Sequence, residues 1–201
     1  MANQTRLKKQ MDFLLEIDKL KQVQRRNLLV NGSRTENTAE HSWHISLLAG
    51  ILQEYSNEPV NLEKVILMLL VHDIVEIDAG DTYAYDEIGN QDKAKREHLA
   101  ADRLFGLLPG DQSQRFKALW LEFEAMQTTE SKYANAADRL MPLWHNYFCG
   151  GTVWKKNQIR KSQVIKRMQP IQNGSQNLWL AAMEIVERAV QDGYVLDDEG
   201  E

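Results

Sequence analysis

The sequence has little of what builds disulfide-stapled or membrane-spanning proteins. Among its 201 residues there is one cysteine, Cys149, so neither an intrachain disulfide nor a zinc site of several thiolates can form. The longest apolar run, residues 65–71, is too short to cross a bilayer. The first residues also lack the apolar segment of a secretion signal. These absences predict a cytoplasmic protein with no membrane partner.

An excess of positive charge is also missing. The chain has 24 lysines and arginines against 29 aspartates and glutamates, which gives a formal net charge of −5. Binding to nucleic acid needs a basic face, so we expect no nucleic-acid partner. A small anionic substrate remains compatible with this charge, because a metal ion and a few arginines are enough to bind it locally.

The alternation with a period of two that is typical of β-strands is absent, and helical periodicity dominates. We therefore expect an all-α fold, a single helical bundle over residues 1–201 with its core at about 11–154. Thr38 and Asn61 are the expected N-caps of two of the helices. The expected helices cover about 11–20, 38–55, 61–77, 91–108, 111–126, 131–147, 158–168 and 176–191, with a polar loop at 27–37 and a frayed acidic tail at 197–201.

The doublet His72-Asp73 stands in an apolar segment that is expected to be helical. Burying an imidazole and a carboxylate there is costly unless something pairs with them, and a divalent metal ion would do so. His41 and Asp138 occupy similar mixed contexts upstream and downstream. The pattern predicts one divalent metal ion held by His41, His72, Asp73 and Asp138. A ligand set of nitrogen and oxygen atoms suits Mn, Co, Mg, Fe or Zn.

Two carboxylates near the doublet are candidates for catalysis. Glu76 lies one helical turn beyond His72 and is expected to orient an attacking water. Asp81 follows a glycine and is a candidate for proton delivery to a leaving alkoxide. An anionic substrate also needs positive partners, because arginine forks fit phosphate oxygens. The candidates before His41 are Arg25, Arg26 and Arg34.

Other polar residues near these positions have two possible placements. His44 is expected to be packed or at the surface. His145 lies two helical turns after Asp138, and it either faces the same pocket or packs elsewhere. Glu36 and Asn37 are expected to organise their loop through bonds from side chain to backbone.

Four segments together resemble a known family: Arg34 to His41, His72 to Glu76, Gly80-Asp81 and Ala137-Asp138. They resemble the HD-domain metal-dependent phosphohydrolases, and within them most closely the 5′-deoxynucleotidase group. The resemblance covers about residues 11–154. It implies an all-helical homodimer that hydrolyses nucleoside 5′-monophosphates, with the metal ligands named above. It also implies catalytic roles for Glu76 and Asp81.

The loop before His41 departs from the group's pattern. The deoxynucleotidases have a tryptophan shortly after a substrate-binding arginine, whereas the sequence Arg25-Arg26-Asn27-Leu28 has no aromatic residue. Either Arg25 or Arg26 matches the group's arginine. A preference for deoxyribose is therefore not implied by the resemblance.

The function expected from the sequence is a metal-dependent phosphomonoesterase, in which a metal-bound hydroxide attacks phosphorus. One alternative is a phosphodiesterase or guanosine-polyphosphate hydrolase of the HD type, with the same metal centre. Another is a non-catalytic helical binding module that keeps the metal as a structural staple. Glu76 and Asp81 favour an enzyme, because a staple needs neither of them.

Overall fold

The structure, a computed structural model, describes residues 2–86 and 88–198. Helices dominate it, as the sequence predicts, and the all-α class is confirmed. The helices and strands, in chain order, are α1 (Ala2–Glu16), η1 (Ile17–Gln22), β1 (Gln24–Leu28), β2 (Thr35–Asn37), α2 (Thr38–Ile51), η2 (Gln53–Tyr55), α3 (Leu62–Val71), α4 (Glu76–Ala79), α5 (Lys93–Phe105), α6 (Gly110–Ala125), α7 (Thr129–Phe148), α8 (Thr152–Lys156), α9 (Lys161–Met168), α10 (Ile171–Gly174) and α11 (Gln176–Gln191).

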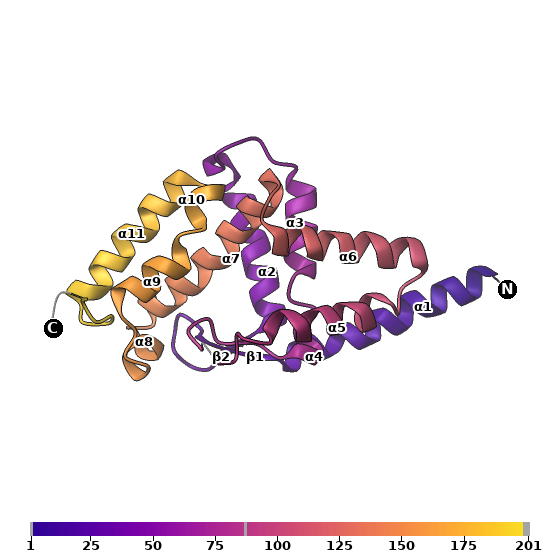
Figure 1. Ribbon diagram of the computed structural model, residues 1–201, viewed down its shortest axis with the longest axis horizontal. Coiled ribbons are helices and arrows are strands. Elements are labelled where there is room, and N and C mark those ends of the chain that lie inside the picture. Colours follow the sequence, from indigo (N-terminus) through magenta and orange to yellow (C-terminus); the bar gives the residue numbers. More distant parts are fainter. Residues whose placement is uncertain (1, 87, 199–201) are drawn as a thin grey trace.

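Helix α7 lies at the centre of the larger cluster of buried apolar residues, between α2 and α3 on one side and α9 to α11 on the other (Figure 1). Its Tyr133 is fully buried and donates a hydrogen bond of 2.8 Å to the carbonyl oxygen of Ala49 in α2. Helix α10 approaches α7 so closely that a Cβ atom on Gly174 would lie 2.4 Å from the carbonyl oxygen of Lys132. This packing fixes α7, and with it Asp138, against the rest of the bundle.

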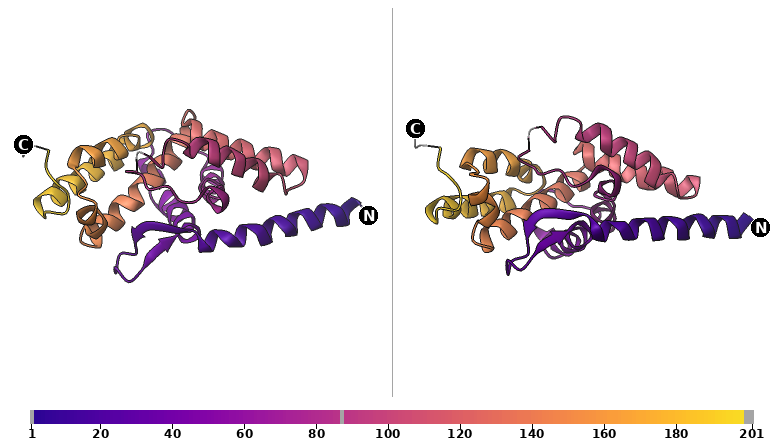
Figure 2. Two further views of the ribbon diagram at one scale, coloured as in Figure 1. Left: turned by 60° about the horizontal axis from the view of Figure 1, so that its bottom comes forward. Right: turned by 90° about the horizontal axis from the view of Figure 1, so that it is seen from below.

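A second cluster of buried apolar residues lies toward the N-terminal side, around Phe105 of α5 and Trp120 of α6. Leu20 of η1 and Val75, just before α4, also belong to this cluster. Helix α1 runs along this part and extends outward at its N-terminal end (Figure 2). The two clusters meet along α3, whose residue Leu67 packs against both.

The segment expected to be a loop at residues 27–37 contains part of a small antiparallel hairpin. Strand β1 pairs with β2, with Gln24 opposite Asn37 and Leu28 opposite Thr35. The sequence does not predict the hairpin because its strands are short and polar, without alternating apolar residues. Its position matters, since β2 leads directly into the helix that carries His41.

The helix expected over residues 61–77 is interrupted, which corrects the prediction. Helix α3 ends at Val71, residues 72–75 form turns, and α4 begins at Glu76. The amide of Ile74 bonds to the carbonyl oxygen three residues earlier, and so does the amide of Glu76. The chain is therefore wound more tightly than an α-helix at the His72-Asp73 doublet.

Helix ends differ from the expected ones in a few places. Asn37, not Thr38, is the N-cap of α2, and it forms a capping box with Glu40. Asn61 caps α3 as expected. The short helices α8 and α10 were not expected, whereas α11 has the expected bounds of 176–191.

The acidic tail is partly tied to the bundle. Both carboxylate oxygens of Asp198 accept hydrogen bonds from Ser162 at the start of α9, which corrects the expectation of fraying at this residue. Residues 199–201 of the expected tail lie outside the described residues. Within the described part of the chain, no helix combines the length and the apolar character that a membrane span requires.

Candidate metal centre and active site

Four side chains from three separate helical segments meet in the interior. His41 lies on α2, His72 and Asp73 follow the end of α3, and Asp138 lies on α7. The Nε2 atom of His41 is 3.0 Å from Oδ1 of Asp138, and Nε2 of His72 is 3.6 Å from the same oxygen. Asp73 places one oxygen 3.0 Å from Nε2 of His72 and the other 4.0 Å from Nε2 of His41. The structure thus brings together all four residues that the sequence predicts as metal ligands.

The hydrogen bonds behind the two imidazoles decide what this cluster needs. His72 bonds through Nδ1 to the carbonyl oxygen of Leu69 at 2.7 Å, which requires a proton on Nδ1. Its Nε2 atom therefore turns a lone pair toward the carboxylates and has no hydrogen-bond partner. His41 likewise has Nδ1 at 3.5 Å from Glu36 and Nε2 toward Asp138. Lone pairs and negative charges that converge in a buried site need a cation between them. The donor set of two imidazoles and two carboxylates fits a divalent metal ion.

In the absence of a metal ion, bound protons supply part of the positive charge that the buried carboxylates need. Burial alone would lower the pKa of His72, but the charges of Asp73 and Asp138 outweigh burial and hold this pKa well above its ordinary value. Burial would raise the pKa of Asp138, but its contacts with the two histidines hold it well below its ordinary value. The electrostatics of the site therefore favour bound positive charge.

The interruption after α3 brings neighbouring residues to one point. On a regular helix, adjacent side chains point about 100° apart, because each turn contains about 3.6 residues. The tight turns at residues 72–75 change this geometry, so that His72 and Asp73 approach each other within 3.0 Å. The same turns place Glu76 at the start of α4, beside the metal centre.

Glu76 and Asp81 line the same cavity as the metal centre, which has a volume of about 150 Å³. Glu76 is buried and accepts a hydrogen bond of 2.9 Å from the hydroxyl of Thr38. Burial and the nearby charge of Asp73 raise the pKa of Glu76 well above its ordinary value. Burial also raises the pKa of Asp81, against the opposing effect of Arg25. Two carboxyl groups with raised pKa values beside one metal centre are suited to proton transfer.

Asp81 reaches the cavity through the turn that ends α4. Gly80 has a φ of +75°, in the region that side chains disfavour, and its amide bonds to the carbonyl oxygen of Glu76. The chain then turns back over the site. This geometry agrees with the sequence-based expectation for a carboxylate after a glycine at a helix end.

The three predicted arginines are placed differently. The side chain of Arg25 is only 10% exposed, and its Nη1 atom lies 2.9 Å from Asp73 and 3.8 Å from Asp81. Arg26 lines the cavity over the ring of Tyr83, 5.9 Å from its centroid. Arg34 is not brought to the cavity: it is exposed, and its guanidinium forks onto Glu40.

Glu36 is a buried residue whose role the sequence did not reveal. One of its oxygens lies 3.5 Å from Nδ1 of His41, 3.7 Å from Nδ1 of His145 and 3.8 Å from Nε of Arg25. This carboxylate therefore lies behind both a predicted metal ligand, His41, and the buried Arg25. Such second partners fix the orientation and tautomer of a ligating histidine.

His145 lies behind His41 and does not line the metal cavity, which settles the placement left open by the sequence. Its ring is 5.5 Å from that of His44, and these two histidines form with Glu36 a second cluster of potential ligand atoms. Arg25 lies 3.8 Å from the same carboxylate, and its fixed positive charge opposes a second cation there. The cluster is better described as support for His41.

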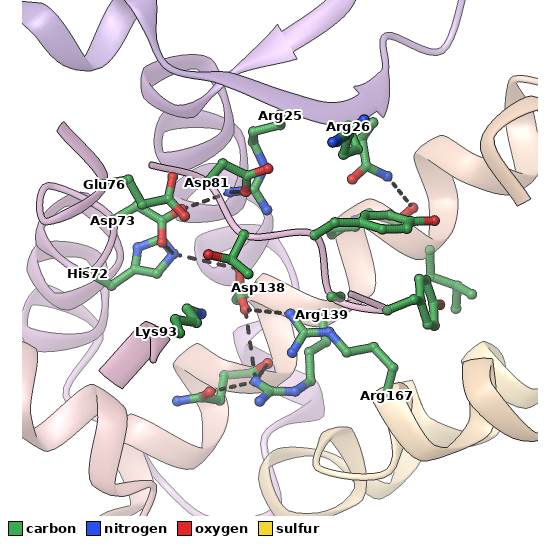
Figure 3. Close-up of a pocket in the computed structure, with 18 of the residues that line it drawn as sticks. Arg25, Arg26, His72, Asp73, Glu76, Asp81, Lys93, Asp138, Arg139 and Arg167 are labelled. Atoms are coloured by element: carbon green, nitrogen blue, oxygen red, sulfur yellow. Dashed lines mark hydrogen bonds and ion pairs between the residues drawn. The ribbon is translucent and has the colours of Figure 1, made fainter. Parts of the chain in front are cut away.

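Sequence reasoning missed three further cations that line the cavity. Lys93 comes from α5, Arg139 from α7 and Arg167 from α9. In Figure 3, Arg139 and Arg167 lie on the side of Asp138 opposite to Arg25. Only Arg139 had a signal in the sequence, because it directly follows a predicted metal ligand. Arg167 lies on a distant amphipathic helix whose cations resemble an ordinary solvated face.

Comparison with known proteins agrees with this geometry. The model of a family described as "HD domain" matches residues 17–179. The human 5′-deoxynucleotidase HDDC2 is 28% identical over 130 residues, which is 64% of this chain and 62% of the relative. The 5′-deoxynucleotidase YfbR of Escherichia coli O1:K1 / APEC is 30% identical over 141 residues, 66% of this chain and 69% of the relative. The chain thus spans about 62% of the length of the human relative that it matches.

Solved structures show the same fold over nearly the full length. A protein of Magnetospirillum magnetotacticum MS-1, described as a "predicted metal-dependent phosphohydrolase", is 48% identical with a TM-score of 0.93, and the match covers 97% of this chain and 98% of the other. A conserved hypothetical protein of Pyrococcus furiosus, 20% identical with a TM-score of 0.59, shares the fold over 90% of this chain and 99% of its own. The family match extends over most of the chain and includes all four residues of the candidate metal centre. The chain belongs to the HD domain family.

Proposed function

We propose that this protein is a metal-dependent phosphomonoesterase that hydrolyses nucleoside 5′-monophosphates. The observation that carries the proposal is a cavity lined by His72, Asp73 and Asp138 together with Glu76, Asp81 and Arg25. His41 lies directly behind this cavity, 3.0 Å from Asp138. The similarity to two proteins named 5′-deoxynucleotidases supports a nucleotide as the substrate. The four ligands would hold one divalent metal ion, and the native ion is one of Mn, Co, Mg, Fe and Zn.

The chain's own residues divide the work of the reaction. A bound divalent ion would supply a Lewis acid for the phosphoryl oxygens and lower the pKa of water. Glu76, held by the hydroxyl of Thr38, orients the attacking water and accepts its proton. Asp81, whose pKa is raised by burial, delivers a proton to the leaving oxygen. Arg25, fixed against Asp73, supplies positive charge to the transferred phosphoryl group.

Release of phosphate tests the proposal. We expect the protein with Mn²⁺ or Co²⁺ to release phosphate from nucleoside 5′-monophosphates. Asp73→Ala should lose metal and activity together. Glu76→Gln should keep the metal, measured by elemental analysis, but lower kcat by about 10²- to 10⁴-fold, which is the usual contribution of a general base. Unchanged rates in folded variants would contradict these roles.

A wider substrate panel separates the proposal from its alternatives. Cyclic nucleotides and polyphosphorylated guanosine nucleotides test the phosphodiesterase and polyphosphate hydrolase readings. A non-catalytic module would show metal-dependent stability without turnover of any member of the panel. The presence of Glu76 and Asp81 in the cavity supports the enzyme.

A homodimer located in the cytoplasm belongs to the same proposal. Large apolar side chains are exposed along α1 at positions that share a helical face, and a second copy of the chain could cover them. They include Leu7, Met11 and Leu14. Size-exclusion chromatography with light scattering measures the oligomeric state directly.

A further inference from the structure

Arg139 and Arg167 lie between two cavities of the protein. Both line the metal cavity, and both also line a neighbouring, more open cavity of about 370 Å³. Ala84 and Tyr85 belong to both linings as well, so the two cavities adjoin. A ligand bound at the metal centre can therefore extend past the two arginines.

The two arginines lack a carboxylate partner of their own. Nη1 of Arg139 and Nη2 of Arg167 each lie 3.9 Å from Oδ2 of Asp138. The other oxygen of Asp138 faces His41 and His72, so this carboxylate is committed to the metal centre. Among the residues that the structure describes, no other carboxylate oxygen lies within 4.0 Å of either guanidinium group. When a dication binds Asp138, the nearest carboxylate of both arginines is taken up by the metal centre, and Glu124 acts on Arg139 only from farther away.

Arg139 is also buried and held in place. It is 8% exposed, and its Nη1 atom donates to the backbone carbonyl and the side chain of Asn135. Its Nε atom is buried and without a hydrogen-bond partner. Arg139 and Arg167 thus place two positive charges on the same oxygen of Asp138. Two like charges held close together indicate a position for an anion.

Within the described part of the chain, the second cavity is lined by positive charge alone, whereas the metal cavity is lined by charges of both signs. Among the described lining residues of the second cavity are three cations, Arg139, Lys166 and Arg167, and no aspartate or glutamate. The metal cavity, in contrast, has aspartates and glutamates from several elements in its lining. In Figure 3 the two arginines lie away from Arg25, which is the partner of Asp73 and Asp81. Arg25 thus supplies positive charge beside the metal centre, and Arg139 and Arg167 supply it separately, toward the second cavity.

We propose that Arg139 and Arg167 form a second phosphate-binding position, so that the favoured substrates are nucleotides with a further phosphate group besides the one that is hydrolysed. This inference rests on the proposed phosphohydrolase function. A guanidinium group binds phosphate oxygens through charge-assisted hydrogen bonds, which are stronger than hydrogen bonds between neutral groups. One further phosphate bound in this way should lower KM by about tenfold or more.

Steady-state kinetics with three substrates tests the position. They are a nucleoside 5′-monophosphate, the corresponding 5′-diphosphate and the 3′,5′-bisphosphate, each with Mn²⁺. We expect at least one of the two doubly phosphorylated nucleotides to have a kcat/KM about tenfold or more above that of the monophosphate. Arg167→Gln should reduce this ratio to near one. Lys161→Gln, on the same helix but paired with Glu187, should leave the ratio unchanged.

A binding measurement separates failure of this inference from failure of the proposed function. Calorimetry with the same three nucleotides and the Mn²⁺-loaded Glu76→Gln variant, whose turnover is slowed, reports binding apart from catalysis. Binding that is strengthened by the second phosphate and weakened by Arg167→Gln supports the position even if no nucleotide is hydrolysed. Turnover of the monophosphate with no gain from either second phosphate, or with equal losses for all three nucleotides in Arg167→Gln, overturns the inference and leaves the phosphomonoesterase intact.

Discussion

His41 shows how much one side chain of this site depends on its neighbours. Its Nε2 atom faces Asp138 at 3.0 Å, while its Nδ1 atom faces Glu36 at 3.5 Å. If Nε2 binds a metal ion, the proton of the neutral ring lies on Nδ1, where the carboxylate of Glu36 favours it. Because Glu36 also faces Arg25, the same carboxylate contacts both a proposed metal ligand and a proposed phosphate-binding residue.

Glu36→Gln is therefore expected to weaken metal binding by about 10- to 100-fold, the usual effect of losing such a partner. Titration calorimetry with Mn²⁺ measures the change. Glu40→Gln is the matched control, since glutamine also completes a capping box and Glu40 points to Arg34 at the surface. Equal metal affinities in the wild type and Glu36→Gln would show that Glu36 only fills space.

At the level of single residues, the sequence predicted which four side chains meet in the interior, but not their surroundings. His41, His72, Asp73 and Asp138 were identified because polar side chains in apolar segments are costly without a partner. The position of Arg34 was misjudged, since its neighbour Glu40 holds it at the surface. Arg167 could not be found at all, because only the packing of the C-terminal helices against α7 brings it to the cavity.

At the level of elements, the helices that carry the ligands begin at well-defined caps. Asn37 caps α2 four residues before His41. Thr128 caps α7 by accepting a hydrogen bond of 3.2 Å from the amide of Ser131, ten residues before Asp138. The two caps are alike in chemistry but differ in their distance from the metal centre.

Replacing each cap should show that loss of stability and loss of metal affinity are separate effects. Asn37→Ala and Thr128→Ala are each expected to lower the free energy of unfolding by about 1 kcal/mol, measured by urea denaturation. Only Asn37→Ala should also weaken metal binding, because it loosens the first turn of α2 and the strand that holds Glu36. A similar loss of metal affinity in Thr128→Ala would contradict this local argument.

The interruption after α3 and the β-hairpin are the two elements that sequence periodicity missed. Apolar residues continue through Ile74 and Val75 at helical spacing, so nothing in the pattern marks the end of α3 at Val71. The tight turns accompany tertiary contacts, among them the ion pair between Asp73 and Arg25 of β1. Both features therefore depend on pairing between distant segments, which local periodicity does not report.

At the level of the whole molecule, the fold class followed from periodicity because amphipathic helices bury their apolar faces in the same core. The described part confirms the all-α fold, and the family match confirms the HD domain. That residues 1–201 form one domain stays a prediction.

The charge of the metal centre links the stability of the whole protein to pH. In the metal-free protein the pKa of His72 is raised above the ordinary value of 6.5. A raised pKa means that the folded state binds this proton more tightly than the unfolded state. The contribution to stability is complete below about pH 6.5 and is lost as the pH rises through the folded-state pKa.

We therefore expect Tm of chelator-treated protein to fall as the pH rises above about 6.5, toward the raised pKa of His72 in the folded state. With saturating Mn²⁺ the fall should disappear, because the metal binds the deprotonated ligands in place of the proton. Scanning calorimetry at a series of pH values measures both curves. Parallel curves with and without metal would show that the metal and this proton do not share the site.

The spacing of the ligands also has a consequence for folding kinetics. Asp138 lies 97 residues after His41, and the two meet only when α2 and α7 are packed together. The complete site is therefore absent from the unfolded chain and from any transition state in which these helices are still apart. A metal ion that binds only the finished arrangement slows unfolding far more than it speeds folding. In a chain with one cysteine, the ion would hold distant segments together only in the folded state, whereas a disulfide also constrains the unfolded chain.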